Sequence, residues 1–424
     1  MCYGSQPSEA RQRYEQTAIT MAERGLRVIA VGQAYLPYAV YENDVPPRPE
    51  GLQLLGFVGM IDPLRADSKI AVQACHEAGV KVTMITGDHR VTALAIAREL
   101  GLASNENQVA TADDIVGKSQ QQLAELVEKT RVFARVTPRQ KLEIVNAARS
   151  SGHFVAVTGD GVNDAPALRA ANIGVAMGKS GTDVAREAAE LVISDDNFGS
   201  IVAGIEEGRI AYDNIRKVTY LLVSMGAAEL LMVLLSVIVG LPIPLLPVQL
   251  LWLNLVTNGI QGVALAFEPG EGDSLKRKPR DPAEPLFNRL MLERILIATL
   301  VVGLGGFAVF ATAIHYGWST EAARNLLLLT MVLYENFHIG NCRSETKSAF
   351  YLSPLRSPVL FFGTIGALLL HVVAMHVPFL QNVLSTEPVS IAMWGVVVLV
   401  AVLIVPAVEI HKWLGQNRNQ TSNG

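Results

Sequence analysis

The stretch that decides the fold is TGDGVNDAPAL, residues 158–168, which directly follows the apolar run Phe154–Val157. An apolar run, then a polar turn, then the helical pattern Ala165–Ala171 predicts a buried strand that leads through a loop into a helix. Glycines in the turn let the backbone bend tightly and approach an anion, while Asp160 and Asp164 offer the hard oxygen ligands that Mg²⁺ prefers. The stretch therefore predicts a strand end that holds a metal ion beside an anionic group.

The residues on both sides of this stretch repeat the same alternation of strand and helix. We expect buried parallel strands at Leu54–Ile61, Val80–Thr86, Arg131–Ala134 and Phe154–Thr158, with helices at Arg90–Leu100 and Arg139–Arg149. This alternation predicts a doubly wound α/β domain, in which ligands bind beyond the carboxyl ends of the strands.

A second polar turn lies at one of those strand ends. Thr86 offers a hydroxyl and Gly87 a backbone N–H to a phosphoryl oxygen, and Lys141, near a helix start, offers a positive charge. Each part also has a plainer interpretation, since Gly-Asp turns are common strand exits and most helix lysines are only solvated. Together with Asp160 and Asp164, the parts favour metal-assisted phosphoryl transfer.

The composition of the chain differs between its two halves. Over 424 residues, 35 Lys and Arg against 39 Asp and Glu give a net charge of −4, with 50% hydrophobic residues and three cysteines. These values exclude a disordered chain, a small disulfide-stapled domain and a dominantly nucleic-acid-binding protein. From Val218 onward, however, six apolar segments are long enough to span a membrane: 218–240, 246–267, 291–316, 322–341, 358–379 and 389–411.

The loops between these segments predict the topology, because Lys and Arg beside spans favour the cytoplasmic side. The loop after the second segment and the loop after the fourth are rich in basic residues: Lys276, Arg277, Lys278, Arg280 and Arg289, then Arg343, Lys347 and Arg356. We therefore expect residues 1–217 and the tail from Lys412 to lie together in the cytoplasm.

The apolar segments contain a few polar residues at regular spacing. Asn254, Thr257, Asn258 and Gln261 recur at i, i+3, i+4 and i+7, which predicts one polar face directed into a helix bundle. Glu229 and Glu335 are isolated carboxylates at membrane depth and suit a cation. Hydrogen bonding between helices is the alternative interpretation of the asparagines.

With these residues in view, the chain resembles the P-type cation-transporting ATPases. The resemblance rests on TGDGVNDAPAL, on Thr86–Asp88, on FARVTPRQK at 133–141 and on Asp62–Arg65, which look like the HAD-like phosphorylation domain of that family. It continues through AMGKSGTDVAREAAELVISDDNF, EEGR at 206–209, PVQLLWLNLVTNG and KPRDPAEPLF, and so covers nearly all of the chain from Leu26. The pattern is most similar to the branch that contains calcium pumps and sodium–potassium pumps.

The resemblance implies roles for individual residues, with ATP and Mg²⁺ as cofactors. Its implied catalytic residues are Asp160, Lys141, Thr86, Gly87, Asn163 and Asp164, of which Asp160 and Asp164 hold magnesium. Its implied nucleotide-binding or hinge residues are Arg27, Asp62, Arg65, Asp88 and Arg135, and its transported-cation ligands are Glu229, Asn254, Thr257, Asn258 and Glu335. The implied domains are the end of a nucleotide-binding domain with a linker (1–50), the phosphorylation domain (51–217) and a six-span cation-transporter domain (218–424).

The departures from the family are equally informative. The sequence contains no D-K-T-G-T motif, which carries the phosphorylated aspartate in such pumps, and the earlier spans are missing too. We therefore expect a C-terminal portion that cannot hydrolyse ATP alone and that needs the N-terminal half of the pump in cis or in trans. The other expected partners are membrane lipid and the transported cation, with no nucleic acid, and the expected location is the plasma membrane.

The identity of the ion and two other functions stay open. Asn258 stands where calcium pumps carry an aspartate, so a monovalent cation is as well supported as calcium. One alternative is a nonenzymatic, ion-binding membrane subunit that assembles with a separate N-terminal half. Another is a phosphatase that uses Asp62 as nucleophile, which Pro63-Leu64-Arg65 disfavours because such hydrolases place an acid or threonine two residues after the nucleophile.

Overall fold

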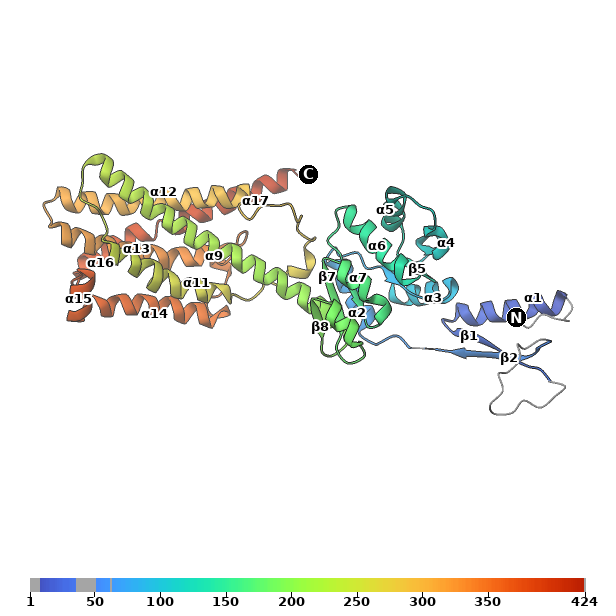
Figure 1. The fold of residues 1–424 in the computed structure, drawn as a ribbon. Coiled ribbons are helices and arrows are strands. Elements are labelled where there is room, and N and C mark those ends of the chain that lie inside the picture. Colours follow the sequence, from blue (N-terminus) through green and yellow to red (C-terminus); the bar gives the residue numbers. More distant parts are fainter. Residues whose placement is uncertain (1–7, 36–50, 62, 423–424) are drawn as a thin grey trace. The chain divides into compact units, whose positions relative to one another are not determined.

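The computed structural model describes residues 8–35, 51–61 and 63–422 (Figure 1). These residues form two compact units, which are considered one at a time. The first unit comprises 1–206 and 275–282, and the second comprises 207–274 and 283–424. The boundary expected after residue 217 lies inside the second unit, within helix α9 (Phe198–Val239).

The first unit contains three small sheets. The first is an antiparallel pair of β1 (Arg27–Gln33) and β2 (Gln53–Met60). The other two are parallel and three-stranded. One has the order β3-β5-β4, from Met84–Ile85, Val132–Ala134 and Val109–Thr111, and the other has the order β6-β7-β8, from Ala156–Gly159, Ile173–Met177 and Leu191–Ile193. In both parallel sheets the strand that precedes a predicted site turn, β3 or β6, is at an edge.

One of the expected parallel strands is wrong. The segment predicted at Leu54–Ile61 is a strand, but it pairs antiparallel with β1 in its own two-stranded sheet, and many of its residues are exposed. Apolar content alone indicates a strand without specifying its partner, and here the neighbour that supplies hydrogen bonds is β1. The strands expected at 80–86 and 154–158 are confirmed in shortened form as β3 and β6.

Eight helices accompany these strands in the described part of the first unit. They are α1 (Ser8–Glu23), α2 (Ser68–Glu77), α3 (Arg90–Leu100), α4 (Ala112–Ile115), α5 (Gln120–Lys129), α6 (Pro138–Ser150), α7 (Ala165–Ala170) and α8 (Asp183–Ala188). The helices expected at 90–100 and 139–149 are thus confirmed as α3 and α6.

Helix α6 holds the two parallel sheets together. It starts where Thr137 caps it, with Pro138 in the first turn, a position that tolerates the missing N–H of proline. Ile144 then packs in a cluster with Phe133 of β5, while Val145 packs in another with Val157 of β6. Because one helix serves both cores, the ends of β5 and β6 are held at a fixed separation.

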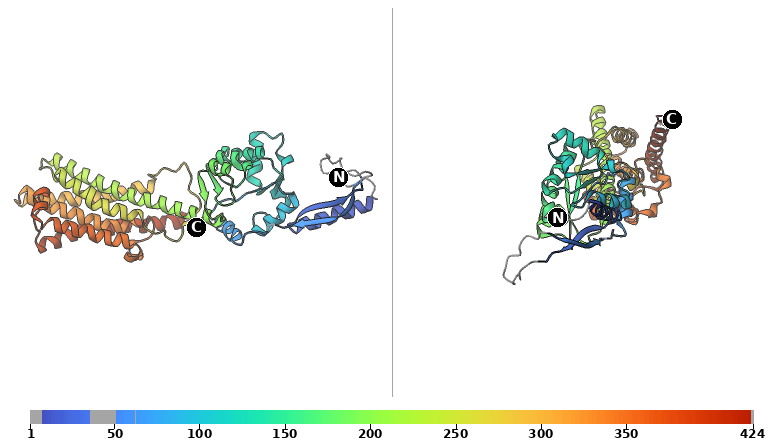
Figure 2. Two further views of the ribbon diagram at one scale, coloured as in Figure 1. Left: turned by 60° about the horizontal axis from the view of Figure 1, so that its bottom comes forward. Right: turned by 90° about the vertical axis from the view of Figure 1, so that its right-hand side faces the viewer.

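The second unit is a bundle of helices that run side by side in the views of Figure 1 and Figure 2. Its helices are the greater part of α9, then α10 (Pro247–Leu251), the π-helix η3 (Trp252–Thr257), α11 (Asn258–Ala266), α12 (Arg289–His315), α13 (Thr320–Cys342), α14 (Pro358–Ala374), α15 (Pro378–Leu384), α16 (Ile391–Ala401) and α17 (Ile404–Ser422). The expected continuation of a helix from about Asp213 into the first apolar segment is confirmed by α9.

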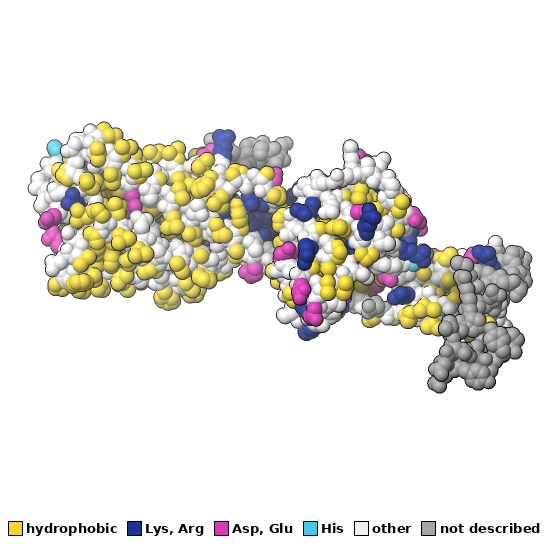
Figure 3. Space-filling view, in the orientation of Figure 1, with side chains coloured by type: hydrophobic (Ala, Val, Ile, Leu, Met, Phe, Trp, Pro, Cys, Tyr) yellow, Lys and Arg dark blue, Asp and Glu magenta, His cyan; other side chains and the backbone are white. Residues whose placement is uncertain are grey.

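Apolar side chains cover the outside of this bundle and polar ones lie within it. Leu230, Val263 and Leu399 are exposed, whereas Asn258 and Glu335 are fully buried. The face drawn in Figure 3 shows mostly hydrophobic and few charged side chains over these helices. An apolar exterior around polar side chains is the reverse of a water-soluble protein and fits a bundle surrounded by lipid.

Within the described residues, three helices are long and apolar enough to cross a membrane, or four if a bent pair forms one span. The three are Phe198–Val239, Arg289–His315 and Ile391–Gly415, and the pair is α14 with α15, which bend by 93°. The expected count of six is not confirmed by this measure. Segment 246–267 fails the length test because it is divided among α10, η3 and α11. Helix α13 fails the test of apolar composition because it contains polar residues, which are tolerated there since most of the helix is buried among other helices.

Candidate functional site

The turn after β6 has the geometry that its sequence predicts. Asp160 is exposed directly beyond the strand, and its backbone carbonyl accepts a 2.8 Å hydrogen bond from the Thr182 N–H. A Cβ atom on Gly159 would lie 2.5 Å from Cβ of Asp164, which no packed structure tolerates. Glycine at 159 therefore lets the Asp164 side chain fold back over the strand end, where it also accepts from the Gly161 N–H at 3.2 Å.

Lys141 reaches the same turn from helix α6. Its Nζ lies 2.7 Å from Oδ1 of Asp164, and both side chains are largely buried, at 21% and 16% exposed. Lys141 is in the first turn of α6, which the reciprocal bonds of Thr137 and Gln140 anchor. The ion pair thus places a lysine charge at the carboxyl end of β6, as the motif predicts.

The turn after β3 forms a second compact loop. The Thr86 hydroxyl donates to Asp88 Oδ2 at 2.9 Å, and the Asp88 N–H donates back to that hydroxyl at 3.1 Å. The Arg135 N–H donates to the Asp88 carbonyl at 3.2 Å, and Arg135 adopts the left-handed region at φ 56°. A non-glycine residue held there stores strain, which is common where a side chain is positioned for function.

The environment of His89, next to this turn, also reflects the charge of Arg135. The pKa of His89 is lowered, first by loss of contact with water and then by the positive guanidinium of Arg135. The two predicted nucleotide residues Asp88 and Arg135 therefore lie next to each other beyond β3 and β5, where the positive charge of Arg135 affects neighbouring groups.

Arg65 contacts a different part of the first unit. Its guanidinium donates to the backbone carbonyl of Asp196, another non-glycine residue in the left-handed region, at φ 56°. The Asp196 side chain in turn accepts from the N–H groups of Lys179 and Ser180 at 2.9 and 2.7 Å, and these bonds lower its pKa to about 2. This arrangement braces the segment after β8 and agrees with the hinge half of the role expected for Arg65.

Three predicted residues of the first unit remain: Arg27, Asn163 and Asp62. Arg27 is exposed on β1, in the two-stranded sheet, whereas the two site turns lie beyond the parallel sheets. Asn163 is exposed in the turn after β6, and Asp62 lies outside the described residues. Thr182 is a positioning residue that the motifs did not single out, although SGT at 180–182 belongs to the quoted pattern.

The turn after β6 fits a magnesium ion through Asp160 more directly than through Asp164. The Asp160 carboxylate is exposed beside a glycine-rich turn, whereas Asp164 is engaged by Lys141 and by the Gly161 N–H. Mg²⁺ usually takes one or two carboxylates and keeps several waters, so a single free carboxylate beside a bound anion satisfies its needs.

A second site lies within the helix bundle. The Asn254 amide donates to Glu229 Oε2 at 3.0 Å and so joins the π-helix η3 to α9. Glu335 of α13 is fully buried, with the Thr257 hydroxyl beside it and the Glu229 carboxylate within electrostatic range. Three segments therefore bring the predicted cation ligands into one interior region.

Several polar atoms in this region have no hydrogen-bond partner among the described residues. They are Oε1 of Glu229, both amide atoms of Asn258, both amide atoms of Gln261, and both carboxylate oxygens of Glu335. Buried polar groups are almost always satisfied, so this cluster indicates a place for a cation or water. The carboxylate and amide oxygens could bind either one, whereas the two amide nitrogens are donors and need an acceptor such as water. No three His, Cys, Asp or Glu side chains gather anywhere in the described ranges, so amide and hydroxyl oxygens must supplement the two carboxylates.

The π-helix changes the predicted polar face. Thr257, Asn258 and Gln261 are fully buried, but Asn254 is mostly exposed, although its amide still reaches Glu229. A π-helix has more residues per turn than an α-helix, so residues that cross it do not keep the i, i+3, i+4 alignment. Such turns concentrate at functional sites, and Trp252–Thr257 coincides with the residues beside Glu229.

Fold and sequence motifs together define a class of protein: a HAD-like domain joined to a helix bundle that has an apolar exterior and buried polar side chains. Comparison with known families agrees. Residues 8–172 match the family described as haloacid dehalogenase-like hydrolase, and residues 242–414 match the family described as cation transporting ATPase, C-terminus. The chain therefore belongs to the P-type cation-transporting ATPases, of which it is a C-terminal portion.

Individual relatives give the same result. The chain is 40% identical over 393 residues to a calcium-transporting ATPase of Bacillus subtilis, covering 92% of this chain and 44% of the relative. It is 40% identical over 407 residues to the probable cation-transporting ATPase F of Mycobacterium tuberculosis, covering 94% and 45%. To the calcium-transporting ATPase type 2C member 2 of Mus musculus it is 36% identical over 377 residues, covering 89% and 39%. The chain thus spans less than half the length of these curated relatives.

Proposed function

We propose that this chain supplies the magnesium-binding turn and the cation pathway of a pump that couples ATP hydrolysis, through an aspartyl phosphate, to cation transport. The observation that carries the proposal is the cluster of buried oxygens without a hydrogen-bond partner among the described residues, which α9, α11 and α13 contribute. Carboxylate and amide oxygens in a lipid-embedded bundle are costly unless they bind something, and a cation satisfies them together.

The membrane topology of the pump follows from the same bundle. We assign six spans: the three helices that are apolar enough alone, the bent pair of α14 and α15, α13, and the interrupted segment α10–η3–α11. The 23 residues of α13 extend about 35 Å, enough for the hydrocarbon core. Its polar residues need not contact lipid, because its sequence from Leu326 to Glu335 is buried among other helices. Residues 1–217 and the C-terminus then lie in the cytoplasm, and we propose the plasma membrane as the location.

The first unit performs the chemistry through its own residues. Asp160 would hold Mg²⁺, which supplies charge neutralisation at the phosphoryl group when bound. Lys141 directs its ammonium to the same strand end, and Thr86 with the Gly87 N–H orients phosphoryl oxygens beyond β3. Asp88 and Arg135 contact the nucleotide beside this strand end. Arg27 of β1 and Asp62 also contact the nucleotide. Arg65 braces the hinge.

The order of the strands supports the need for another segment. β3 pairs with β5 and β6 pairs with β7, so the outer edges of both site strands remain without a partner strand in the described chain. A segment that carries the phosphorylated aspartate would lie between the two site turns if it joined these edges. We therefore assign the partner as the N-terminal half of the pump, in cis or in trans.

Calcium and a monovalent cation are both accommodated by the site. Glu229 and Glu335 provide two carboxylates, whereas Asn258 provides only a neutral amide. Calcium favours several charged oxygens and takes six to eight ligands, so this set supports one calcium ion or a singly charged ion. The names of the bacterial and mouse relatives favour calcium.

Coexpression tests the proposal. The purified chain alone should hydrolyse no ATP, while coexpression with the N-terminal half of the Bacillus subtilis relative should give cation-dependent ATPase activity that Asp160→Ala abolishes. Steady phosphate release by the chain alone, lost in Asp160→Ala, would contradict the need for a second half. Asn163→Ala is the matched variant in the same turn, and it should reduce activity less because Asn163 makes no direct charge contact.

A nonenzymatic ion-binding subunit is the second candidate. The observation in its favour is that the second unit holds all five predicted cation ligands on its own elements. Cation binding to the chain alone, with no activity regained on coexpression with any N-terminal half, would favour this candidate over the pump.

A further inference from the structure

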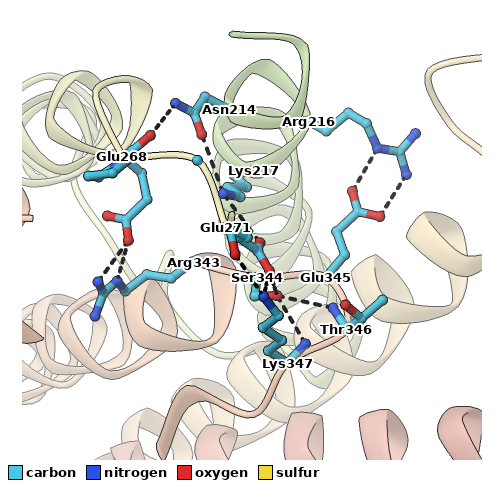
Figure 4. A network of polar contacts seen from close by, with 12 residues as sticks. Asn214, Arg216, Lys217, Glu268, Glu271, Arg343, Ser344, Glu345, Thr346 and Lys347 are labelled. Atoms are coloured by element: carbon cyan, nitrogen blue, oxygen red, sulfur yellow. Dashed lines mark hydrogen bonds and ion pairs between the residues drawn. The ribbon is translucent and has the colours of Figure 1, made fainter. Parts of the chain in front are cut away.

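A network of ion pairs lies at one end of the helix bundle and is separate from both sites above. We call it the clamp and define it by residues from three segments: Asn214, Arg216 and Lys217 of α9; Glu268 and Glu271 after α11; and Arg343, Ser344, Glu345 and Lys347 after α13 (Figure 4). The segments after α11 and after α13 are far apart in sequence, yet both meet α9 here.

The first contact of the clamp attaches α9 to the end of α11. The Asn214 side-chain amide donates to the carbonyl of Ala266 at 3.0 Å and to that of Glu268 at 2.8 Å. The last carbonyls of a helix have no partner within it, so Asn214 caps α11 from a neighbouring helix. Any sliding of α11 along α9 breaks both bonds.

The second contact is a carboxylate shared between two lysines. Glu271 lies 3.6 Å from Lys217 Nζ of α9 and 3.5 Å from Lys347 Nζ, and it accepts from the Ser344 hydroxyl at 2.9 Å. Lys217 is only 3% exposed, and it also approaches Asn214 Oδ1 at 3.4 Å. One carboxylate therefore joins α9, the segment after α11 and the turn after α13.

Two further ion pairs complete the connections. The Arg343 guanidinium donates to Oε1 of Glu268 through Nε and Nη2, at 2.9 and 2.7 Å, with both residues nearly fully buried. The Arg216 guanidinium donates hydrogen bonds to both carboxylate oxygens of Glu345, at 2.6 and 3.2 Å. Paired planar contacts of this kind fix orientation as well as distance.

The three segments that the clamp joins are the ones that carry the candidate cation ligands. Glu229 is on α9, Thr257 and Asn258 are on η3 and α11, and Glu335 is on α13. Arg343 is eight residues beyond Glu335 and Ala266 is eight beyond Asn258, so the clamp lies about 12 Å along α13 and α11 from these ligands. On α9, Lys217 is twelve residues before Glu229, which is about 18 Å along the helix. A rigid helix transmits an axial shift over that length.

Stability alone does not explain so many buried charges. Removing two charges from water costs as much as their attraction returns, and apolar replacement of a buried pair is often neutral or stabilising. Such pairs can instead specify one geometry among several. We infer that the clamp is a positioning device that sets the axial register of α9, α11 and α13 and so holds the cation ligands at coordinating distance. This inference rests on the proposed function.

The test uses the full chain in lipid nanodiscs, with binding of radioactive Ca²⁺ and of Na⁺ measured as an affinity and as a number of sites. The double variant Lys217→Met with Glu271→Leu removes the carboxylate and its buried lysine together. Lys347 also loses its contact with Glu271, but its side chain is 42% exposed, so no buried charge is left. We expect the number of sites and the Tm to be retained while the Kd of the bound ion rises roughly tenfold. If the clamp only stabilised the fold, the double variant would instead show fewer ion-binding sites per chain, because less protein would be folded, and the Kd of those sites would be unchanged.

The matched control removes an ion pair between helices that carry no candidate ligand. Glu293 of α12 and His411 of α17 lie 3.4 Å apart, so Glu293→Leu with His411→Leu should leave the Kd unchanged. Equal Kd values for the clamp variant, the control and the unaltered chain would overturn the inference. A separate outcome concerns the site itself: if Glu229→Gln and Glu335→Gln bind ions like the unaltered chain, the proposed cation site is wrong.

A second clamp variant covers the case in which the first does not fold. Exchanging the partners in Arg343→Glu with Glu268→Arg keeps the charges but reverses them, and it should restore part of the affinity that Arg343→Glu alone loses. Failure of the exchange to improve on the single variant would count against positioning by this pair.

Discussion

The Lys141 ammonium lies 2.7 Å from Oδ1 of Asp164, and this ion pair joins the helix after β5 to the turn after β6. Two separate sheets thereby present their site turns to one region, although no strand joins them. The pair also leaves Asp160 as the carboxylate that remains open for a metal ion.

Replacing Lys141 should affect stability and activity together. Lys141→Met leaves the half-buried Asp164 carboxylate without its cation, so we expect the free energy of unfolding to fall by about 1–3 kcal/mol. In the reconstituted pump we expect the rate of phosphorylation to fall by about 10²-fold, because a charge beside the transferred group is lost. Denaturant unfolding of the chain and phosphorylation by ATP of the coexpressed pump are the measurements.

Arg139→Gln provides the control on the same helix. Arg139 is 88% exposed in its pair with Glu143, and an exposed pair of this kind contributes less than about 1 kcal/mol. Equal losses in both variants would mean that the position of Lys141 in the turn has no special effect.

A glycine comparison tests the close approach at the end of β6. In Gly159→Ala the new Cβ meets Cβ of Asp164 at 2.5 Å, and we expect a loss of about 1–3 kcal/mol because the turn must shift. In Gly161→Ala the nearest atom is Asp164 Oδ2 at 3.5 Å, an ordinary contact, so the loss should be much smaller. Thermal unfolding of the two variants distinguishes them, and a reversed order would show that the turn is built differently.

The stability of the first unit should depend on pH through Glu128. Bonds from Lys81 and then from His153 hold its pKa at about 2, below the ordinary value of 4.5. A carboxyl with a lowered pKa adds stability above about pH 4.5 and loses it as the pH falls toward 2. Glu128→Gln should therefore lower the Tm slightly at pH 7, with a difference that shrinks as the pH falls from 4.5 toward 2.

Because Glu128 is 39% exposed, the difference at pH 7 should stay below about 1 kcal/mol. Glu125→Gln, at an exposed position of the same helix, is the comparison. A Tm difference for Glu128→Gln that grew as the pH fell would contradict the assigned sign.

Restoring a charge in the bundle should change ion preference. Asn258→Asp adds a third carboxylate near Glu229 and Glu335, so we expect tighter Ca²⁺ binding relative to Na⁺. Without calcium the same change buries an uncompensated charge, and the chain should be less stable by about 1–3 kcal/mol. Unfolding with and without Ca²⁺ measures both effects, and equal Tm shifts in the two conditions would place residue 258 away from the ion.

The sequence predicted the positions of the site turns in the first unit better than its strand pairing. TGDGVNDAPAL places Asp160 and Asp164 as expected, since glycine spacing and strand ends are local features. The antiparallel partner of the segment at 54–61 depends on which other strand lies nearby, and that information is not in the segment itself. Arg65 likewise contacts Asp196, more than a hundred residues away, which no spacing rule predicts.

Within the bundle, the prediction of buried polar residues succeeded for Glu335, Asn258 and Thr257. It was less accurate for Asn254, because the stripe assumed a uniform α-helix and the π-helix changes the rotation per residue. The clamp was not predicted at all. Arg216 and Lys217 lie on α9, and the other charges lie in the segments after α11 and α13. Basic residues in such loops indicate membrane topology by their number, and this rule says nothing about their ion-pair partners.

In the described chain the outer edges of β3 and β6 have no partner strand, and this affects the solubility of the chain when it is alone. Exposed strand edges are templates for self-association, and Phe154, just before β6, adds an exposed aromatic ring at 63%. A chain made without its other half should therefore aggregate through these edges or be degraded. If the proposed N-terminal half is a separate chain, we expect this chain to remain soluble only when the two are made together.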